Sequence, residues 1–240
     1  MIKHLPNTLT CGNLFCGCLA VFHAVEGNFT SVAGLVFIAL ILDFLDGFVA
    51  RLLRVQSAIG KELDSLADMV TFGVVPGIAM VQMLRGAGIP QPFAYFGLLL
   101  TVFSALRLAK FNTDTRQTTS FIGLPTPANA VFILSLPFII LQKDFQASII
   151  GSSYMLIAIT IVFSLLMVSE IAMFSLKFKR FSWSDNKIQF IFIGISITLL
   201  LIFRSNALSF IIITYIMLSI INNLYFNNIE INHGEVSGRN

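Results

Sequence analysis

Long runs of apolar residues, separated by short polar gaps, dominate this chain of 240 residues. A helix of about 17 to 25 mainly apolar residues is long enough to cross the hydrocarbon core of a bilayer. Eight such runs occur, near residues 8–25, 31–53, 62–85, 92–112, 126–142, 149–169, 188–203 and 206–226. We therefore predict an all-α fold, a polytopic membrane helical bundle of about eight transmembrane helices.

Charged residues are scarce, which supports this class. They make up 11% of the chain, whereas soluble domains carry roughly 25%. The composition also excludes a disordered or a disulfide-rich secreted chain. The three cysteines, Cys11, Cys16 and Cys18, fall in one apolar run, so we interpret them as small membrane-helix residues and not as a disulfide or zinc framework.

Two boundaries of the predicted spans need a physical argument. Only Arg204 and Ser205 separate the last two runs, and we place a break there because one helix through both would be roughly twice as long as a bilayer is thick. The first run resembles a signal peptide, but it has no clear small-residue cleavage site and seven further spans follow it. We therefore predict that it is a retained first helix.

The basic residues predict the orientation, because Lys and Arg accumulate on the cytoplasmic side of membrane proteins. With eight spans and a cytoplasmic N-terminus, only Arg85, Lys143 and Arg204 lie outside. The inner side holds Lys3, Arg51, Arg54, Lys61, Arg107, Lys110, Arg116, Lys177, Lys179, Arg180, Lys187 and Arg239. We therefore expect both termini in the cytoplasm. Such a basic face suits anionic lipid headgroups or an anionic substrate, and we expect no nucleic-acid partner.

Four aspartates fall within the second and third predicted spans, where acidic residues are expensive and usually mark a site. Asp43 and Asp46 are three residues apart and Asp64 and Asp68 are four apart, so each pair projects from one face of its helix. The connection between the two helices is short, so they should be antiparallel neighbours. All four carboxylates would then meet near the cytoplasmic membrane edge.

Four crowded carboxylates repel one another unless protons or cations intervene. Two divalent ions would neutralise them, and carboxylate oxygens suit Mg²⁺ or Mn²⁺, which can clamp phosphate oxygens when two are held close together. Gly47, Ala50 and Gly60 would let a flat base or a phosphate approach the backbone. Arg51 could contact a phosphate or pair with a carboxylate.

Each of these residues also has a simpler interpretation. Asp64 alone could be a solvated helix cap beside Lys61 and Glu62, and glycines in membrane helices often serve packing. The combined pattern is far more specific, because Asp-x-x-Asp-Gly-x-x-Ala-Arg, eight residues and Gly-x-x-x-Asp-x-x-x-Asp run without departure from Asp43 to Asp68.

This string resembles the signature of the CDP-alcohol phosphatidyltransferase family. Four further stretches, which cover the first five spans, resemble the branch of the family that uses serine as acceptor: LPNTLTCGNLFCG (Leu5 to Gly17), SAIGKELDSLADMVTFGVVPG (Ser57 to Gly77), ALRLAKFN (Ala105 to Asn112) and FIGLPTPANA (Phe121 to Ala130). The last three spans are identifiable only as hydrophobic helices.

The resemblance implies a role for each motif residue. Asp43, Asp46 and Asp64 would hold two divalent metals, with Asp68 completing the second site and acting as general base. The implied contacts to the CDP group are Asn7, Thr10, Gly47, Ala50, Arg51 and Gly60. The implied reaction moves a phosphatidyl group from CDP-diacylglycerol to the serine hydroxyl and releases CMP.

The choice of serine as acceptor depends on fewer residues. Arg107 and Lys110, at the inner end of the fourth span, could bind its carboxylate, and Asn112 could hydrogen-bond its amine or carboxylate. From charge placement alone, the two cations could equally be ordinary inner-side charges. Lys110 stands where the branch more usually has Arg, which keeps the charge but loses the bidentate fork. The prediction of serine therefore depends on the resemblance of RLAKFN and GLPTPANA to the branch of the family that uses serine.

The expected organisation follows from these assignments. Residues 1–169 would form the family core of about six transmembrane helices, 170–226 two additional helices with a preceding basic loop, and 227–240 a polar tail. We expect an integral protein of a bacterial inner membrane, with its site near the cytoplasmic face and a possible homodimer. Two alternatives stay open: another family member such as a phosphatidylglycerophosphate synthase, or a cation transporter that uses membrane-embedded carboxylates.

Overall fold

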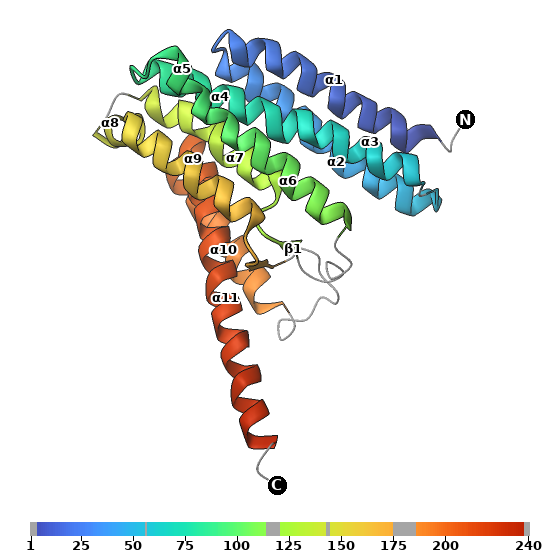
Figure 1. Cartoon of the computed structure of the whole chain (residues 1–240). Helices are drawn as coiled ribbons and strands as arrows, with labels where there is room; N and C mark the ends of the chain where they lie inside the picture. The colour runs from blue at the N-terminus through green and yellow to red at the C-terminus, as the bar shows by residue number, and fades with distance from the viewer. Residues whose placement is uncertain (1–3, 56, 114–120, 143–144, 175–185, 238–240) are drawn as a thin grey trace.

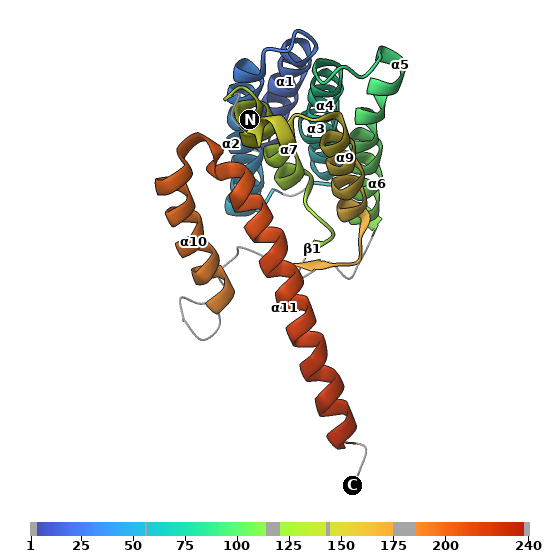
Figure 2. The same cartoon turned by 90° about the vertical axis from the view of Figure 1, so that its left-hand side faces the viewer.

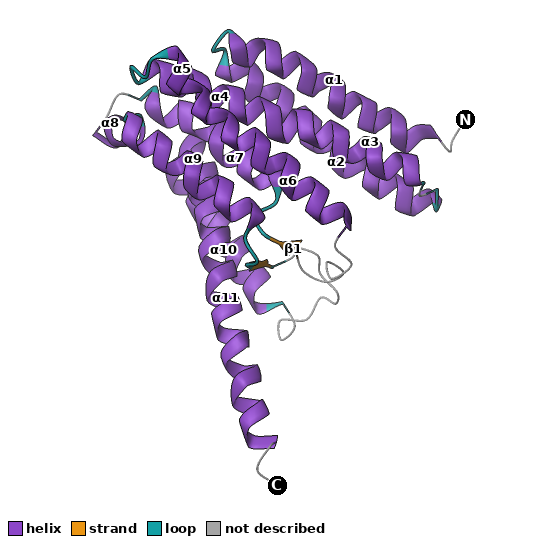
Figure 3. Ribbon diagram, viewed as in Figure 1, coloured by secondary structure: helices purple, strands orange, loops and turns teal. Residues whose placement is uncertain are grey.

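Helices make up almost all of the computed structural model, which describes residues 4–55, 57–113, 121–142, 145–174 and 186–237 (Figure 3). The exception is a two-stranded antiparallel sheet of β1 (Phe121–Ile122) and β2 (Ala172–Met173), in which Phe121 pairs with Met173. The mostly helical class predicted from the sequence is therefore confirmed.

The helices run back and forth along one bundle, from which the last one extends away (Figure 1). In chain order they are α1 (Leu5–Val25), α2 (Phe29–Leu53), α3 (Ala58–Asp68), the π-helix η2 (Met69–Val74), α4 (Val75–Gly86), α5 (Gln91–Ala94), η3 (Tyr95–Leu98), α6 (Leu99–Thr113), α7 (Thr126–Ile140), α8 (Phe145–Ile150), α9 (Ser153–Val168), α10 (Lys187–Phe203), η4 (Arg204–Asn206) and α11 (Ala207–Ser237).

Five of the helical segments are long and apolar enough to cross a membrane: Leu5–Val25, Phe29–Leu53, Ala58–Gly86, Gln91–Thr113 and Ala207–Leu224. Three further apolar helices, α7, α9 and α10, are shorter than the usual span. The chain is thus an integral membrane protein with five candidate spans, and the eight predicted spans correspond to these five and the three shorter helices. The count of eight crossings stays a prediction.

The last two long helices are separated by a turn at the predicted place, Arg204 and Ser205. Arg204 has a positive φ of 47°, and the short 3-10 helix η4 turns the chain there. Gln142 and Asn206 exchange two side-chain hydrogen bonds of 2.8 and 3.0 Å, which tie this turn to the end of α7. Helix α11 continues to Ser237, well into the segment 227–240 that we expected to be a polar tail (Figure 2).

The cytoplasmic placement of both termini stays a prediction, and the two ends of the bundle are named by the residues that they carry. The aspartate end is where α2 ends and α3 begins, and it carries Asp43, Asp46, Asp64 and Asp68. The predicted basic loop before α10 lies outside the described residues. The same is true of Lys3, Arg116, Lys143, Lys177, Lys179, Arg180 and Arg239.

The segment from α3 through η2 to α4 lies at the centre of the bundle and is the most buried of the five candidate spans. Helix α1 packs along one side of it, where a side chain at Gly17 would collide with Thr71. Helix α6 packs along the other side, where Thr101 Oγ1 donates to the Gly73 carbonyl at 3.0 Å. These close approaches set the register of three helices that surround the aspartates.

Candidate active site

The turn between α2 and α3 brings the two halves of the aspartate motif to one end of the bundle. Helix α2 ends at Arg54, which adopts a left-handed conformation with φ 54°. Ser57 then caps α3, since its Oγ accepts a hydrogen bond from the Gly60 amide at 3.0 Å. Helix α1 packs against both α2 and α3 and thus completes the aspartate end.

Three of the four aspartates form one cluster. Asp43, Asp64 and Asp68 each offer a carboxylate oxygen, and these oxygens lie within 4.8 Å of one another. Within the described ranges, this is the one group of three or more His, Cys, Asp or Glu side chains close enough to share a metal ion. Three half-buried carboxylates at this spacing fit a hard divalent cation, which would relieve their repulsion.

Asp46 lies beside this cluster and not within it. Its Oδ2 accepts a hydrogen bond of 2.5 Å from Thr10 Oγ1 on α1, and its side chain is almost fully buried. Asp46 and Asp64 both line the cavity described next. The structure therefore brings three predicted ligands together and places the fourth one helical turn from Asp43, facing the cavity.

A cavity of about 540 Å³ opens between α1, α2 and α3 next to the cluster. All six residues predicted to contact a CDP group line it. The complete lining is Pro6, Asn7, Thr10, Asp46, Gly47, Ala50, Arg51, Val55, Ser57, Ala58, Gly60, Lys61 and Asp64. Two basic residues, Arg51 and Lys61, and two acidic residues thus surround a space large enough for a small polar ligand.

Two glycines keep the walls of this cavity free of side chains. A Cβ at Gly60 would lie 3.1 Å from both Asn7 Oδ1 and Ser57 Oγ, so any larger residue would crowd α1. A Cβ at Gly47 would lie 3.5 Å from Arg51 Nη1, which shows that the guanidinium folds back along the cavity face of α2. A side chain at either glycine would therefore take up part of the cavity or crowd its neighbours.

Arg107, one of the three predicted acceptor residues, lies beside the cluster. Its side chain is 6% exposed, which is rare for arginine, and its charge interacts with that of Asp68. Its guanidinium sits 5.0 Å above the ring of Phe111, and its Nε has no hydrogen-bond partner. A buried cation with an unused donor at this position suits an anionic group of a ligand.

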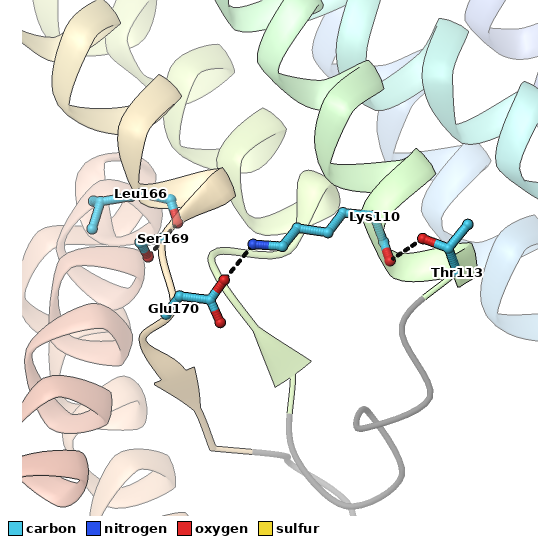
Figure 4. Close-up of polar contacts among 5 residues, drawn as sticks. All are labelled: Lys110, Thr113, Leu166, Ser169 and Glu170. Carbon is cyan, nitrogen blue, oxygen red and sulfur yellow. Dashed lines mark hydrogen bonds and ion pairs between the residues drawn. The ribbon is translucent and has the colours of Figure 1, made fainter.

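The other two predicted acceptor residues make contacts within the protein. Lys110 forms an ion pair of 2.5 Å with Glu170, in the segment that leads from α9 to β2 (Figure 4). Asn112 Nδ2 donates to Ser65 Oγ at 2.8 Å, and the Asn112 carbonyl accepts from Lys61 Nζ at 3.2 Å. Both side chains therefore already have a protein partner, whereas the charge of Arg107 interacts with that of Asp68 in the cluster.

Sequence reasoning missed one residue of this site. Asn13 on α1 is fully buried, and its Nδ2 donates to Asp68 Oδ1 at 3.3 Å. A signal was present, because Asn7, Thr10 and Asn13 recur every third residue along an otherwise apolar helix and so form a polar stripe. Only the packing of α1 against η2 shows that the stripe ends at the fourth aspartate.

The chain belongs to the CDP-alcohol phosphatidyltransferase family, since residues 3–221 match the model of that family. The family depends in general on divalent metals, which agrees with the carboxylate cluster. The resemblance seen in the signature from Asp43 to Asp68 is thereby confirmed, and the match extends over the later helices as well.

Individual relatives within the family are also similar to this chain. The chain is 33% identical over 222 residues to a CDP-diacylglycerol–serine O-phosphatidyltransferase of Helicobacter pylori, covering 92% of this chain and 91% of the relative. It is 34% identical over 161 residues to the Bacillus subtilis protein of the same name, covering 65% of this chain and 88% of the relative. An archaetidylserine synthase of Methanothermobacter thermautotrophicus is 33% identical over 173 residues, 70% of this chain and 68% of the relative.

Proposed function

We propose that this chain is a CDP-diacylglycerol–serine O-phosphatidyltransferase, that is, a phosphatidylserine synthase. One observation carries the proposal beyond the names of the relatives: the cavity lined by all six nucleotide-motif residues adjoins the carboxylate cluster, and a buried arginine lies beside that cluster. The site thus combines space for a nucleotide, ligands for metal ions and a cation for the acceptor.

Metal binding is part of the proposal. Asp43, Asp64 and Asp68 would hold one divalent ion, and Asp46 and Asp64, which both face the cavity, would contribute to a second. Mg²⁺ and Mn²⁺ are the ions that such an oxygen donor set favours. When bound, the ions supply charge stabilisation to the diphosphate oxygens and to the departing CMP.

The protein's own residues bind and orient the two substrates. Gly47 and Gly60 leave room for the cytidine, with Asn7, Thr10 and Ala50 around it, and Arg51 lies where it can meet a phosphate. Arg107 would hold the serine carboxylate. Lys110 and Asn112 also belong to the proposed acceptor side, although Glu170 and Ser65 already engage their side chains.

The proton transfer is assigned to Asp68. Its carboxylate takes the proton of the serine hydroxyl as the hydroxyl oxygen bonds to the lipid-side phosphorus. The bond from that phosphorus to the bridging oxygen breaks, and CMP leaves with the electron pair. Asn13, through its hydrogen bond to Asp68 Oδ1, orients the base for this step. The products are phosphatidylserine and CMP.

We further propose that the protein resides in a bacterial inner membrane with the aspartate end at the cytoplasmic face. Arg51, Arg54, Lys61 and Lys110 all lie at this end, as the distribution of basic residues in membrane proteins would require. A homodimer is also part of the proposal, supported by the family resemblance alone.

An acceptor panel tests this function. Purified protein in detergent receives CDP-diacylglycerol, Mg²⁺ or Mn²⁺, and in separate reactions serine, glycerol 3-phosphate, inositol or inositol phosphate. We expect CMP release and phosphatidylserine only with serine, and loss of both on chelation of the metal. Product from glycerol 3-phosphate instead would identify a phosphatidylglycerophosphate synthase. No CMP release from well-folded protein with any acceptor would favour the cation transporter.

A further inference from the structure

The amide of Asn13 has one satisfied and one unsatisfied end. Its Nδ2 donates to Asp68 Oδ1 at 3.3 Å, whereas its Oδ1 is buried and has no hydrogen-bond partner. The orientation is fixed by chemistry, because a carboxylate only accepts hydrogen bonds and would repel the amide oxygen if the group were turned over. The backbone is held as well, since Thr71 Oγ1 donates to the Asn13 carbonyl at 3.3 Å.

A buried acceptor without a partner is unfavourable unless a ligand supplies the donor. Asn13 cannot find one by rotating, because rotation would break its contact with Asp68. The missing partner is therefore positively charged or carries an N–H or O–H group, and it binds next to Asp68. A phosphate dianion offers neither group and would be repelled by this oxygen.

Arg107, whose charge interacts with the same carboxylate, has an unsatisfied donor where Asn13 has an unsatisfied acceptor. Its Nε is a buried donor without a hydrogen-bond partner, and its charge interacts with Asp68. Asn13 comes from α1 and Arg107 from α6, the two helices that pack on either side of the segment carrying Asp68. One unsatisfied acceptor and one unsatisfied cationic donor thus flank the proposed base.

We infer that Asn13 is a specificity-determining residue that accepts a hydrogen bond from the ammonium group of the acceptor, while Arg107 binds its carboxylate. The pair matches a zwitterion, a 2-amino acid whose side-chain hydroxyl faces Asp68 between them. The inference rests on the proposed function and deepens it, because it states how an amino acid is separated from a sugar phosphate or an inositol. Both atoms are closed to water, so side chains around Asp68 shift to admit the acceptor.

The test compares serine with 3-hydroxypropanoate, which has the hydroxyl and the carboxylate but no amine. The KM for serine and the inhibition constant of 3-hydroxypropanoate against serine are measured on the same preparation of the wild type and of Asn13→Leu. We expect the KM for serine to rise about 10- to 100-fold, as for loss of a hydrogen bond to a charged group. The inhibition constant should stay within about threefold, since the analogue has no amine to lose. The kcat should also fall, because Asp68 loses its partner.

A second variant and a control keep the test decisive. Asn13→Ala removes the same amide without added bulk and should show the same divergence of the two constants if Asn13→Leu does not fold. Thr71→Val loosens the contact of α1 with η2 but leaves the Asn13 amide in place, so both constants should move together or not at all. Equal changes of both constants in the Asn13 variants, or no change, would overturn the inference while phosphatidylserine synthesis by the wild type still stood. A wild type that forms no phosphatidylserine would overturn both proposals.

Discussion

The two sides of the proposed site differ in how the chain builds them. On the nucleotide side, the end of α2, the start of α3 and the turn between them carry most of the cavity lining. Six of the eight motif residues lie there, and only Asp43 and Asp68 do not line the cavity. On the acceptor side, three residues within six positions of α6 have three different partners: Asp68 for Arg107, Glu170 for Lys110 and Ser65 for Asn112.

This difference shows what a motif can and cannot predict. Residues 43–68 form two helix ends and one short turn, so their spacing in sequence nearly sets their spacing in space. The direction of each α6 side chain depends instead on which neighbour packs against it. The Lys110 partner, for example, is 60 residues further along the chain. Variants on the nucleotide side should therefore change the KM for CDP-diacylglycerol, and variants on the acceptor side the KM for serine.

The largest effect is expected at Asp68, where the two sides meet. Asp68→Asn keeps the shape but removes the base, so kcat should fall by about 10²- to 10⁴-fold. Binding of CDP-diacylglycerol, measured by calorimetry at saturating metal, should change little, because Asp68 does not line the cavity and Asp43 and Asp64 still offer their carboxylates to the ion. Glu62→Gln, an exposed acid on the same helix, is the matched control. Substantial residual turnover in Asp68→Asn would contradict the assigned role.

Arg107→Gln should act on the acceptor side alone. Loss of a charge-assisted hydrogen bond predicts a rise in the KM for serine of about 10- to 100-fold, with the KM for CDP-diacylglycerol unchanged. Arg85→Gln, an exposed arginine on α4 at the opposite end of the bundle, should have no effect on either constant. If the KM for CDP-diacylglycerol rose instead, Arg107 would belong to the nucleotide side, and the assignment of Arg107 to the acceptor side would be wrong.

Gly60→Ala should act on the nucleotide side alone. The added Cβ would lie 3.1 Å from Asn7 Oδ1 and Ser57 Oγ, and crowding of this kind costs roughly 1–3 kcal/mol. We expect the KM for CDP-diacylglycerol to rise about tenfold, while the KM for serine stays the same. Gly34→Ala is the control, because nothing lies within 4 Å of a Cβ at that position of α2. An equal effect of the two substitutions would show general destabilisation.

Lys110→Gln should have the smallest effect. Its ion pair with Glu170 is exposed on both sides and contributes about 0–1 kcal/mol to the free energy of unfolding. A drop of that size in thermal stability, measured in detergent, and less than about a threefold change in the KM for serine are expected. A rise in this KM as large as that of Arg107→Gln would mean that Lys110 leaves Glu170 to bind serine.

Much of the fold was predictable because membrane helices are long and uniformly apolar. The helical class and the turn at Arg204 followed from run length alone. The small sheet did not, because two strands of two residues each have no periodic pattern. The π-helix η2, directly after Asp68 and in contact with α1 and α6, was also not predicted, because no residue type signals a π-helix.

The class of protein, the four aspartates and the glycines of the motif could be identified from the sequence, because scarce charges in an apolar chain stand out and a short motif places its own residues. Packing was needed to show which aspartates cluster, that Asn13 contacts Asp68, and that Arg107 interacts with Asp68 whereas Lys110 pairs with Glu170. These contacts join α1, α3 and α6, which are distant in sequence. Their register is set by close backbone approach at Gly17 and Gly73, which depends on the fit of whole helix surfaces.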